Sequence, residues 1–371
     1  MRKKIKEAER IVIKIGSSTL TYQNSKLNLG RIEKLIREIV NLKNQGKEVI
    51  LVSSGAVAAG YGRLKLEASP GTIPEKQALA AIGQGTLMRT YQTIFSEYGY
   101  QVGQVLLTQK DLTDRKRYLN SRNTLYQLLD YNVIPVINEN DTVAVKEIKF
   151  GDNDTLSALV SSLVGADLLV ILSDIDGLYT ADPRNDDSAK LISQVEEISS
   201  EIEELAGGAG TDRGTGGMAT KIDAAKIATK AGLPLVIANG SLDQVVTKIS
   251  EGEDLGTLFL PDSGMTSREQ WIAFNLDIAG KIVIDEGATL ALTKEGGSLL
   301  ACGIVEARGE FSVGDVVDII DQSGSRIAKG LVNYDQPEVD KIKGFQSEEI
   351  KSRLGYQAYD EVVHRDNLVL L

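Results

Sequence analysis

The fold class is decided by residues 11–18, which read IVIKIGSS. An apolar run that ends in a small-residue turn is typical of a buried strand at the first strand-to-helix corner of an α/β sheet. Lys14 is the exception in this run, because a lysine in an apolar strand is costly unless it is paired or reaches a ligand at the strand's end. The alternative is a lysine on an edge strand that faces water, and the stretch alone does not decide between the two.

Apolar runs alternate with helical patterns through the N-terminal two thirds of the chain. Strands are expected at residues 48–53, 102–107, 133–137, 168–172 and 235–238, and helices at 29–44, 75–97, 115–130, 155–163 and 222–231. Nearly continuous apolar strands in this alternation predict an α/β fold, with a mainly parallel sheet sandwiched between layers of helices.

The pattern changes after Phe259. Residues 260–267 read as a linker, and short β-like runs follow at 281–284, 303–305, 315–320 and 327–332, separated by glycine-rich turns. This spacing predicts a small β-barrel-like module. The expected organisation is an α/β domain at 1–259, a linker at 260–275 and a second domain at 276–371.

Composition and charge narrow the class of protein. The chain has 371 residues and a net charge of −11, which disfavours a general nucleic-acid or membrane-surface binder. Its one cysteine, Cys302, rules out an internal disulfide and suits a reducing cytosol. The apolar run at 11–15 is too short for a signal or a membrane span, so the protein is expected in the cytoplasm. A single histidine, His364, argues against most acid–base and triad chemistry.

A glycine-rich stretch precedes the helix expected at 222–231. Residues 207–221 read GGAGTDRGTGGMATK. Glycines allow successive N–H groups to face one point, and a helix N-terminus adds its positive dipole end, so the stretch predicts a phosphate cradle. Lys221 would reach back to the same anion from the helix, whereas the alternative is a mobile surface loop. No Walker loop is present, and a dinucleotide fingerprint at 214–219 is rejected because a helical pattern, not a strand, precedes it.

Polar clusters occur at the ends of several expected elements. Polar side chains gather at residues 138–141, 151–154 and 173–183, and the small residues at 53–60, which include Ser54, would let a ligand approach backbone N–H groups closely. Open α/β sheets bind ligands at the carboxyl ends of their strands, so these side chains are candidate ligand contacts. Acceptors and amides of this kind suit an ammonium group, or could order the lysines of a phosphate site. Their alternative role is in Asx turns and helix N-caps.

Six short motifs carry a resemblance to a known family. They lie at residues 13–18, 53–60, 136–141, 151–154, 176–184 and 214–221. In this order they resemble the amino acid kinase family, and within it the branch of the glutamate 5-kinases. Residues 283–288 and 309–331 are similar to the PUA domain that is often appended in that branch. The resemblance covers nearly the whole chain and implies an amino acid kinase fold followed by a PUA domain.

The resemblance also implies roles for particular residues. Lys14 and Lys221 match positions that stabilise the transferring phosphoryl group, and Asp154 matches the position that organises both lysines. The implied glutamate site contains Ser54, Asp141 and Asn153. The implied ATP site contains Lys14, Ser173, Asp174, Thr215, Gly216, Gly217, Met218, Ala219, Thr220 and Lys221. Ser173 departs from the family pattern, in which threonine is common, but keeps the hydroxyl group.

The activity that the resemblance implies is the ATP-dependent phosphorylation of the γ-carboxylate of L-glutamate to L-glutamyl 5-phosphate, the first step of proline biosynthesis. The implied ligands are glutamate, ATP with Mg²⁺, and proline as a feedback inhibitor, with no dedicated protein site for the metal. A homo-oligomer and a transient contact with glutamyl phosphate reductase, the next enzyme of the pathway, are implied as well.

The residue chemistry agrees independently with a carboxylate as phosphoryl acceptor. A γ-carboxylate is already ionised at neutral pH, so a kinase that acts on it needs no general base. It does need positive charge to stabilise the carboxylate beside the phosphates of ATP. The repulsion between such anions is on the order of 4 kcal/mol per unit-charge pair at about 4 Å. Two lysines, the N–H groups of the glycine-rich stretch and Mg²⁺ carried on ATP would supply that positive charge.

Two other interpretations stay open. One is another member of the same family that phosphorylates aspartate, acetylglutamate, carbamate or a nucleotide, although the cluster at 138–141 favours a free amino acid, whose ammonium group needs acceptors. The other is an RNA-binding or regulatory protein that acts through the PUA-like domain. Residues 271–371 carry 10 Lys and Arg against 17 Asp and Glu, which makes nucleic acid an unlikely partner, because RNA-binding surfaces are normally basic.

Overall fold

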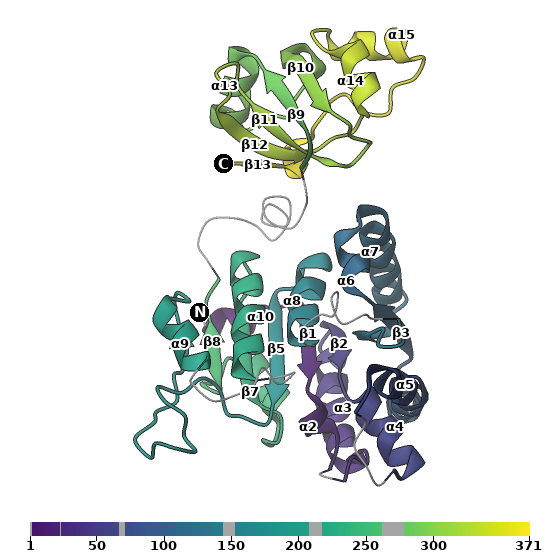
Figure 1. The fold of residues 1–371 in the computed structure, drawn as a ribbon, viewed down its shortest axis with the longest axis vertical. Coiled ribbons are helices and arrows are strands. Elements are labelled where there is room, and N and C mark those ends of the chain that lie inside the picture. The colour runs from purple at the N-terminus through teal and green to yellow at the C-terminus, as the bar shows by residue number, and fades with distance from the viewer. Residues whose placement is uncertain (1, 23, 67–70, 144–152, 208–216, 262–277) are drawn as a thin grey trace. The chain divides into compact units, whose positions relative to one another are not determined.

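The structure is a computed structural model that describes residues 2–22, 24–66, 71–143, 153–207, 217–261 and 278–371. Contacts within the chain divide it into two compact units, Met1–Ser263 and Gly264–Leu371 (Figure 1). No helix in these ranges is long and apolar enough to cross a membrane.

The first unit is built on an eight-stranded sheet in the order β3-β4-β2-β1-β5-β7-β8-β6. The strands are β1 (Arg10–Ile15), β2 (Glu48–Ser53), β3 (Val102–Leu107), β4 (Ile134–Glu139), β5 (Leu168–Ser173), β6 (Gln194–Val195), β7 (Leu235–Asn239) and β8 (Thr257–Phe259). Neighbours are parallel from β3 through to β7, whereas β8 runs antiparallel to β7 and pairs in parallel with β6. The predicted mainly parallel sheet is therefore confirmed.

Lys14 lies on a central strand of this sheet. It is opposite Val52 on one neighbouring strand and Ile171 on the other, and its side chain is buried. The interpretation of Lys14 as an edge-strand lysine that faces water is therefore wrong. A charged group in this position has to be paired, because an unpaired ammonium is very costly away from water.

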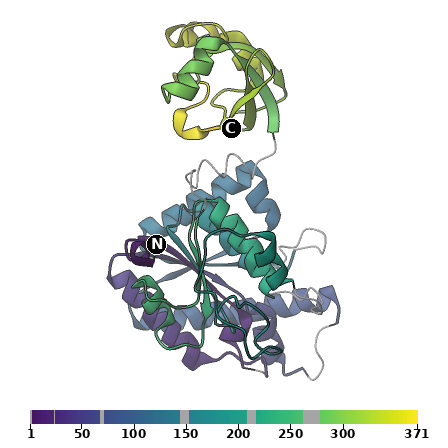
Figure 2. The ribbon, with the colours of Figure 1, turned by 90° about the vertical axis from the view of Figure 1, so that its left-hand side faces the viewer.

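Helices cover both faces of the sheet (Figure 2). They are α1 (Arg2–Ile5), α2 (Ser17–Leu20), α3 (Leu29–Asn44), α4 (Ala56–Leu64), α5 (Ile73–Glu97), α6 (Gln109–Thr113), α7 (Arg115–Asp130), α8 (Asn153–Leu163), α9 (Ser200–Ala206), α10 (Met218–Lys230) and α11 (Val245–Ser250). On one face, alternate apolar residues of β1, β2 and β5 form a continuous core with α3, α5 and α11. On the other face, α8 packs on β1 and β5, and α10 packs on α8.

Two glycines let α4 and α5 pack without side chains between them. A Cβ atom on Gly83 would lie 1.7 Å from the carbonyl oxygen of Ala56, and one on Gly60 would lie 2.0 Å from that of Leu79. The tiny residues at 56–60 were expected in a turn that a ligand approaches closely. Instead they begin α4, where Gly60 meets α5 without a side chain, and Ser54 and Gly55 form the turn after β2.

The second unit has its own sheet and its own hydrophobic core. Its strands are β9 (Ile278–Ile284), β10 (Ile304–Gly309), β11 (Val316–Ile320), β12 (Arg326–Leu331) and β13 (Leu368–Leu370), in the order β10-β9-β11-β12-β13. The β9–β11 pair is parallel and the other pairs are antiparallel. The described part of this unit also contains helices α13 (Glu286–Lys294), α14 (Gln336–Ile342) and α15 (Ile350–Leu354) and three short 3₁₀ segments, which were not expected from its β-like runs.

Candidate active site

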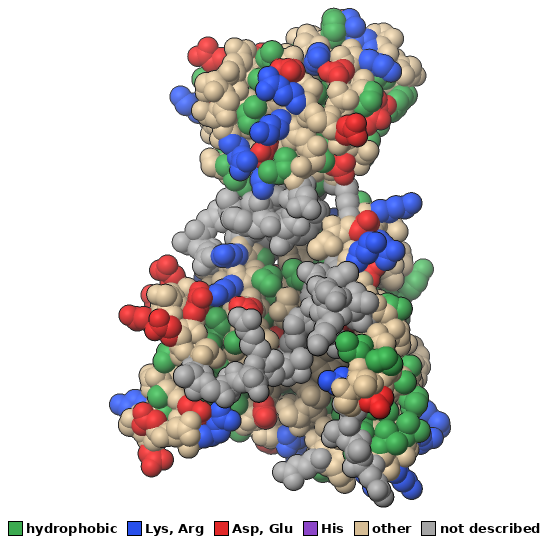
Figure 3. Space-filling view, in the orientation of Figure 1, with side chains coloured by type: hydrophobic (Ala, Val, Ile, Leu, Met, Phe, Trp, Pro, Cys, Tyr) green, Lys and Arg blue, Asp and Glu red, His purple; other side chains and the backbone are tan. Residues whose placement is uncertain are grey.

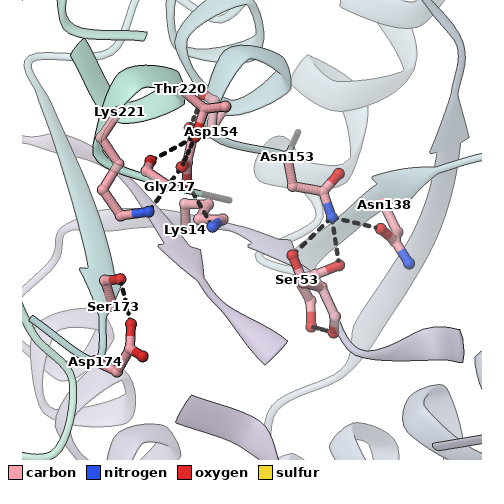
Figure 4. A network of polar contacts seen from close by, with 12 residues as sticks. Lys14, Ser53, Asn138, Asn153, Asp154, Ser173, Asp174, Gly217, Thr220 and Lys221 are labelled. Atoms are coloured by element: carbon pink, nitrogen blue, oxygen red, sulfur yellow. Dashed lines mark hydrogen bonds and ion pairs between the residues drawn. The ribbon is translucent and has the colours of Figure 1, made fainter. Parts of the chain in front are cut away.

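The side chains that the sequence singled out converge at one end of the first unit's sheet. They come from the carboxyl ends of β1, β2, β4 and β5 and from the first turns of α8 and α10. Figure 4 shows two groups there, one around Asp154 and its lysines and the other around the Asn153 amide. Since Asn153 and Asp154 are the first two residues of α8, one helix start contributes to both groups.

The first group, which we call the charged cluster, consists of Lys14, Asp154, Lys221 and Thr220 (Figure 4). The Nζ of Lys14 lies 2.5 Å from Asp154 Oδ1, and the Nζ of Lys221 lies 3.1 Å from Oδ2 of the same carboxylate. Thr220 also donates its hydroxyl to Oδ2 at 3.1 Å. At most 3% of each lysine and none of Asp154 is exposed. The structure thus brings together the three residues proposed for phosphoryl transfer.

Asp154 is ionised in this arrangement. Burial raises the pKa of its carboxyl group, but the two ammonium groups of Lys14 and Lys221 and their hydrogen bonds lower it, and the net direction is downward. A carboxylate between two ammonium groups also reduces the repulsion between them. The site can therefore keep two positive charges close together before any anionic ligand arrives.

Local sequence explains how Lys14 reaches this position. Alternate residues of β1 face opposite sides of the sheet, and Lys14 lies on the side that packs against α8. Two residues later the chain has Gly16, whose Cβ would lie 3.3 Å from the carbonyl oxygen of Leu172 and 3.7 Å from Lys14 Nζ. Glycine thus allows β1 to end close to β5 without crowding the ammonium group.

The second group, which we call the amide cluster, consists of Asn153, Asn138, Gln84, Ser53 and Ser54. The Nδ2 of Asn153 donates to Ser54 Oγ and to Asn138 Oδ1, both at 2.9 Å, and lies 3.4 Å from the carbonyl oxygen of Ser53. Asn138 in turn donates its Nδ2 to Gln84 Oε1 at 2.9 Å. The cluster contains no ionised side chain, and it offers amide and hydroxyl groups for neutral, directional hydrogen bonds.

The proposed ATP residues divide between two elements. Ser173 is the last residue of β5, and its hydroxyl donates to Oδ1 of Asp174 at 3.0 Å (Figure 4). Asp174 is exposed. Gly217 is the N-cap of α10, with no side-chain cap hydrogen bond, and Met218, Ala219 and Thr220 form the first turn. Thr215 and Gly216 lie outside the described residues. An uncapped helix start beside two lysines is a suitable environment for phosphate oxygens.

The other predicted substrate residues are only partly connected. Ser54 hydrogen-bonds to Asn153, whereas Asp141 lies two residues beyond β4 and is partly buried. Gln84 was not among the predicted site residues; its neighbour Gly83 lies where α5 packs against α4, but that glycine does not by itself point to the glutamine. Asn138 was expected only as part of the cluster at 138–141, whose acceptors suit an ammonium group.

Among the described residues, no group of three or more His, Cys, Asp or Glu side chains is arranged to hold a metal ion. Asp154 is the acidic residue deepest in the site, and both of its oxygens face lysines. Its donor set therefore does not fit a Mg²⁺ ion held by the protein alone. Magnesium commonly binds through one or two carboxylates together with substrate phosphates, and this site suits an ion that arrives on ATP.

Comparison with known protein families gives two matches. The profile of the Amino acid kinase family matches residues 9–239, and that of the PUA domain matches residues 280–354. The first match spans more than half of the chain and contains both clusters. The chain therefore belongs to the amino acid kinase family.

Comparison with individual relatives shows which branch of this family the chain resembles. The chain is 58% identical over 363 residues to the Glutamate 5-kinase of Caldanaerobacter subterraneus subsp. tengcongensis, covering 98% of each chain. It is 53% identical over 368 residues to the Glutamate 5-kinase of Moorella thermoacetica, covering 99% of this chain and 97% of the relative. Within its family the chain belongs with the glutamate 5-kinases.

Among solved structures, the UMP kinase from Bacillus anthracis aligns at 18% identity with a TM-score of 0.48, covering 70% of this chain and 98% of that one.

Proposed function

We propose that this protein transfers the γ-phosphoryl group of ATP to the γ-carboxylate of L-glutamate, forming L-glutamyl 5-phosphate and ADP at the first step of proline biosynthesis. The observation that carries the proposal is the pair of buried lysines on one carboxylate, adjacent to a neutral amide cluster, in a chain that belongs with the glutamate 5-kinases. The charged cluster suits a phosphoryl group, and the amide cluster suits the head group of an amino acid.

In the proposed reaction, a γ-carboxylate oxygen attacks the γ-phosphorus and the bond to the β–γ bridging oxygen breaks, so that ADP leaves with that electron pair. The nucleophile is already an anion and needs no general base. Lys14 and Lys221 stabilise the charge on the transferring group, and Asp154 holds them in place. The reaction therefore does not depend on the chain's one histidine, His364.

We assign the ligand contacts as follows. Glutamate binds at Ser54, Asp141 and Asn153, of which Ser54 and Asn153 are joined by a hydrogen bond. ATP binds at Lys14, Ser173, Asp174, Thr215, Gly216, Gly217, Met218, Ala219, Thr220 and Lys221. Mg²⁺ bound to the phosphates of ATP would neutralise part of their charge, beside the lysines of the charged cluster.

The test is a hydroxylamine assay on the purified full-length chain with Mg-ATP. Glutamyl 5-phosphate reacts with hydroxylamine to give γ-glutamyl hydroxamate and phosphate, and the hydroxamate is measured by its coloured iron complex. Glutamate should give the highest kcat/KM among glutamate, aspartate and acetylglutamate, while carbamate and nucleotide acceptors are followed by ADP release. A higher kcat/KM for any of these would contradict the proposal. RNA retention on a filter at physiological salt, absent in our proposal, tests the nucleic-acid alternative.

Proline inhibition belongs to the same proposal. Proline shares the α-amino and α-carboxylate groups of glutamate but lacks the γ-carboxylate, so it would occupy the amide cluster without presenting a nucleophile. Inhibition by proline should therefore be relieved by excess glutamate. Inhibition that persists at saturating glutamate would place proline at another site.

We also propose that the protein forms a homo-oligomer, makes a transient contact with glutamyl phosphate reductase and works in the cytoplasm. Hydrophobic side chains gather over α4 and α5 (Figure 3), and Leu64, Leu66, Ile73 and Ile82 are exposed there. A contiguous apolar surface of this kind is typical of an interface between protein chains. Light scattering on the purified chain tests self-association directly, and a monomer at assay concentration would contradict it.

A further inference from the structure

Two backbone groups fix the direction of the hydrogen bonds between the side-chain amides of the amide cluster. The N–H of Glu139 can only donate, and it donates to Asn138 Oδ1 at 2.9 Å. The carbonyl of Ser53 can only accept, and it lies on the Nδ2 side of Asn153. Asn138 must therefore direct its Nδ2 toward Gln84 Oε1, and Asn153 must direct its Nδ2 toward Asn138.

This fixed direction leaves two polar atoms at the ends of the chain of amides. Asn153 Oδ1 is an acceptor and Gln84 Nε2 is a donor, and neither has a hydrogen-bond partner within the part of the chain that the structure describes. Both side chains are 9% exposed. A buried polar atom without a partner is costly in a folded protein and commonly marks a place that a ligand completes.

We infer that Gln84 is a positioning residue for the glutamate subsite. It holds the Asn138 amide by accepting from Nδ2, and Asn138 in turn holds Asn153 with Oδ1 presented to the ammonium group of the substrate. The inference rests on the proposed function, because it takes Asn153 as a glutamate contact. Gln84 acts through Asn138 and does not itself touch the reacting atoms.

The packing of α5 explains why Gln84 can hold the side chain of Asn138, although the two are far apart in the sequence. Gly83 allows α5 to lie directly against α4, whose first residues follow the Ser54 turn. Two turns further along α5, the hydroxyl of buried Tyr91 hydrogen-bonds to Ser53 Oγ at 2.8 Å. Helix α5 therefore contacts both strand ends of the amide cluster, through Gln84 at β4 and through Tyr91 at β2.

Removing the Gln84 amide would disturb the subsite without touching the lysines. Asn138 is 3% exposed, so its Nδ2 would become a buried donor without an acceptor. The Asn138 amide would rotate toward another acceptor and give up the geometry that Asn153 requires. The loss should therefore appear in the binding of glutamate, and the charged cluster should keep its contacts to Asp154.

The experiment compares Gln84→Met, which keeps the side-chain volume, with Gln92→Met, the same change at an exposed amide pair on the same helix. In the full-length chain, Gln84→Met should raise KM for glutamate about tenfold, the effect of roughly one buried hydrogen bond, while KM for ATP and kcat change less than about twofold. Gln92→Met should alter neither KM. The glutamate-induced rise in melting temperature should shrink in Gln84→Met, while the ATP-induced rise persists.

Two further variants separate positioning from direct contact. Gln84→Glu keeps an oxygen opposite Asn138 Nδ2 and should restore part of the glutamate affinity. In an Asn138→Ala background, Gln84→Met should add less than about twofold to KM for glutamate, because residues that act through one another are not additive. A full tenfold effect in that background, or an equal loss in Gln84→Met and Gln84→Glu, would mean direct contact and overturn the positioning role.

The two proposals fail in different ways. If the wild-type chain phosphorylates glutamate and Gln84→Met leaves KM for glutamate unchanged, the inference about Gln84 is overturned and the proposed function stands. If the wild-type chain does not phosphorylate glutamate, both are overturned. If Gln84→Met does not fold, Gln84→Glu decides: a rise in glutamate KM smaller than tenfold that disappears in the Asn138→Ala background supports the positioning role, and an unchanged KM or a rise that persists in that background overturns it.

Discussion

The charged cluster and the amide cluster are neighbours at the same end of the sheet, but they differ in whether their acceptor atoms are already paired. In the charged cluster, both oxygens of Asp154 face a lysine. In the amide cluster, Asn153 Oδ1 has no hydrogen-bond partner among the described residues. The two regions are supplied by consecutive residues at the start of α8, so the difference arises from side-chain chemistry at almost the same backbone position.

This difference indicates how each region is prepared for its ligand. Two buried ammonium groups repel one another, so they need a permanent counter-charge to persist without a ligand, and Asp154 is that counter-charge. Neutral amides need no counter-charge and can leave one atom open at a smaller cost. Variants in the charged cluster should therefore affect stability and turnover, whereas variants in the amide cluster should affect the affinity for one substrate.

The largest effect is expected from Asp154→Asn. The change leaves Lys14 and Lys221 buried without a counter-charge, and removing one partner of a buried ion pair typically costs about 3–5 kcal/mol of folding stability. Urea unfolding followed by circular dichroism measures this loss. Asp182→Asn, which removes an exposed ion pair with Arg184, is the matched control and should leave the unfolding curve unchanged. An equally small effect at Asp154 would contradict the role of its charge.

Lys221→Ala should have the next largest effect, this time on turnover. Asp154 keeps Lys14 as a partner in this variant, so the fold should persist. Loss of one preorganised charge at the transferring phosphoryl group typically costs about 3–4 kcal/mol, which corresponds to a fall in kcat of about 10²- to 10³-fold. Lys226→Ala, on the same helix but paired with Glu203 near the surface, is the control. Near-normal turnover in a folded Lys221→Ala chain would exclude the proposed role.

The two lysines of the charged cluster were predictable from the residue pattern, whereas the roles of Asp154 and Thr220 were implied by the resemblance. A lysine inside an apolar strand requires a partner, and the glycine-rich stretch before a helix placed Lys221 near an anion. The structure decided the remaining question, because the register of β1 between β2 and β5 excludes an edge position for Lys14. The resemblance implied that Asp154 organises both lysines, and the structure supplies the two contacts that do so.

The amide cluster was only partly predictable, for a physical reason. Asn138 and Asn153 lie in polar runs at element ends, where such residues attract attention. Gln84 lies inside a long helix, where a glutamine normally faces solvent, and its partner Asn138 is 54 residues away in the sequence. A single buried amide on a helix does not disturb the hydrophobic pattern, so composition and periodicity cannot reveal it.

A smaller and more selective effect is expected from Asn153→Ala. The variant removes the open acceptor and the hydrogen bonds to Ser54 and Asn138. KM for glutamate should rise about ten- to a hundredfold, as expected for the loss of one or two hydrogen bonds to a charged group, while KM for ATP changes less than about twofold. Titrations of each substrate at saturating levels of the other measure the two constants. An equal rise in both would show that the two clusters do not serve different substrates.

The smallest effect is expected from pH, and it tests the balance of forces in the charged cluster. Burial alone would raise the pKa of Asp154, but the two lysines reverse this and lower the pKa below its ordinary value of 3.8. An acid with a lowered pKa in the folded state contributes its full stabilisation above its ordinary pKa and loses it only as the pH falls through the lowered value.

The kcat/KM for glutamate, followed by ADP release, should therefore be flat from about pH 6 to pH 8. As the pH falls further, the γ-carboxylate of the substrate, with an ordinary pKa of about 4.3, should take up a proton before Asp154 does. An acid limb that appears near neutral pH in wild type and disappears in Asp154→Asn would mean that burial outweighs the lysines and that Asp154 is not a permanent counter-charge.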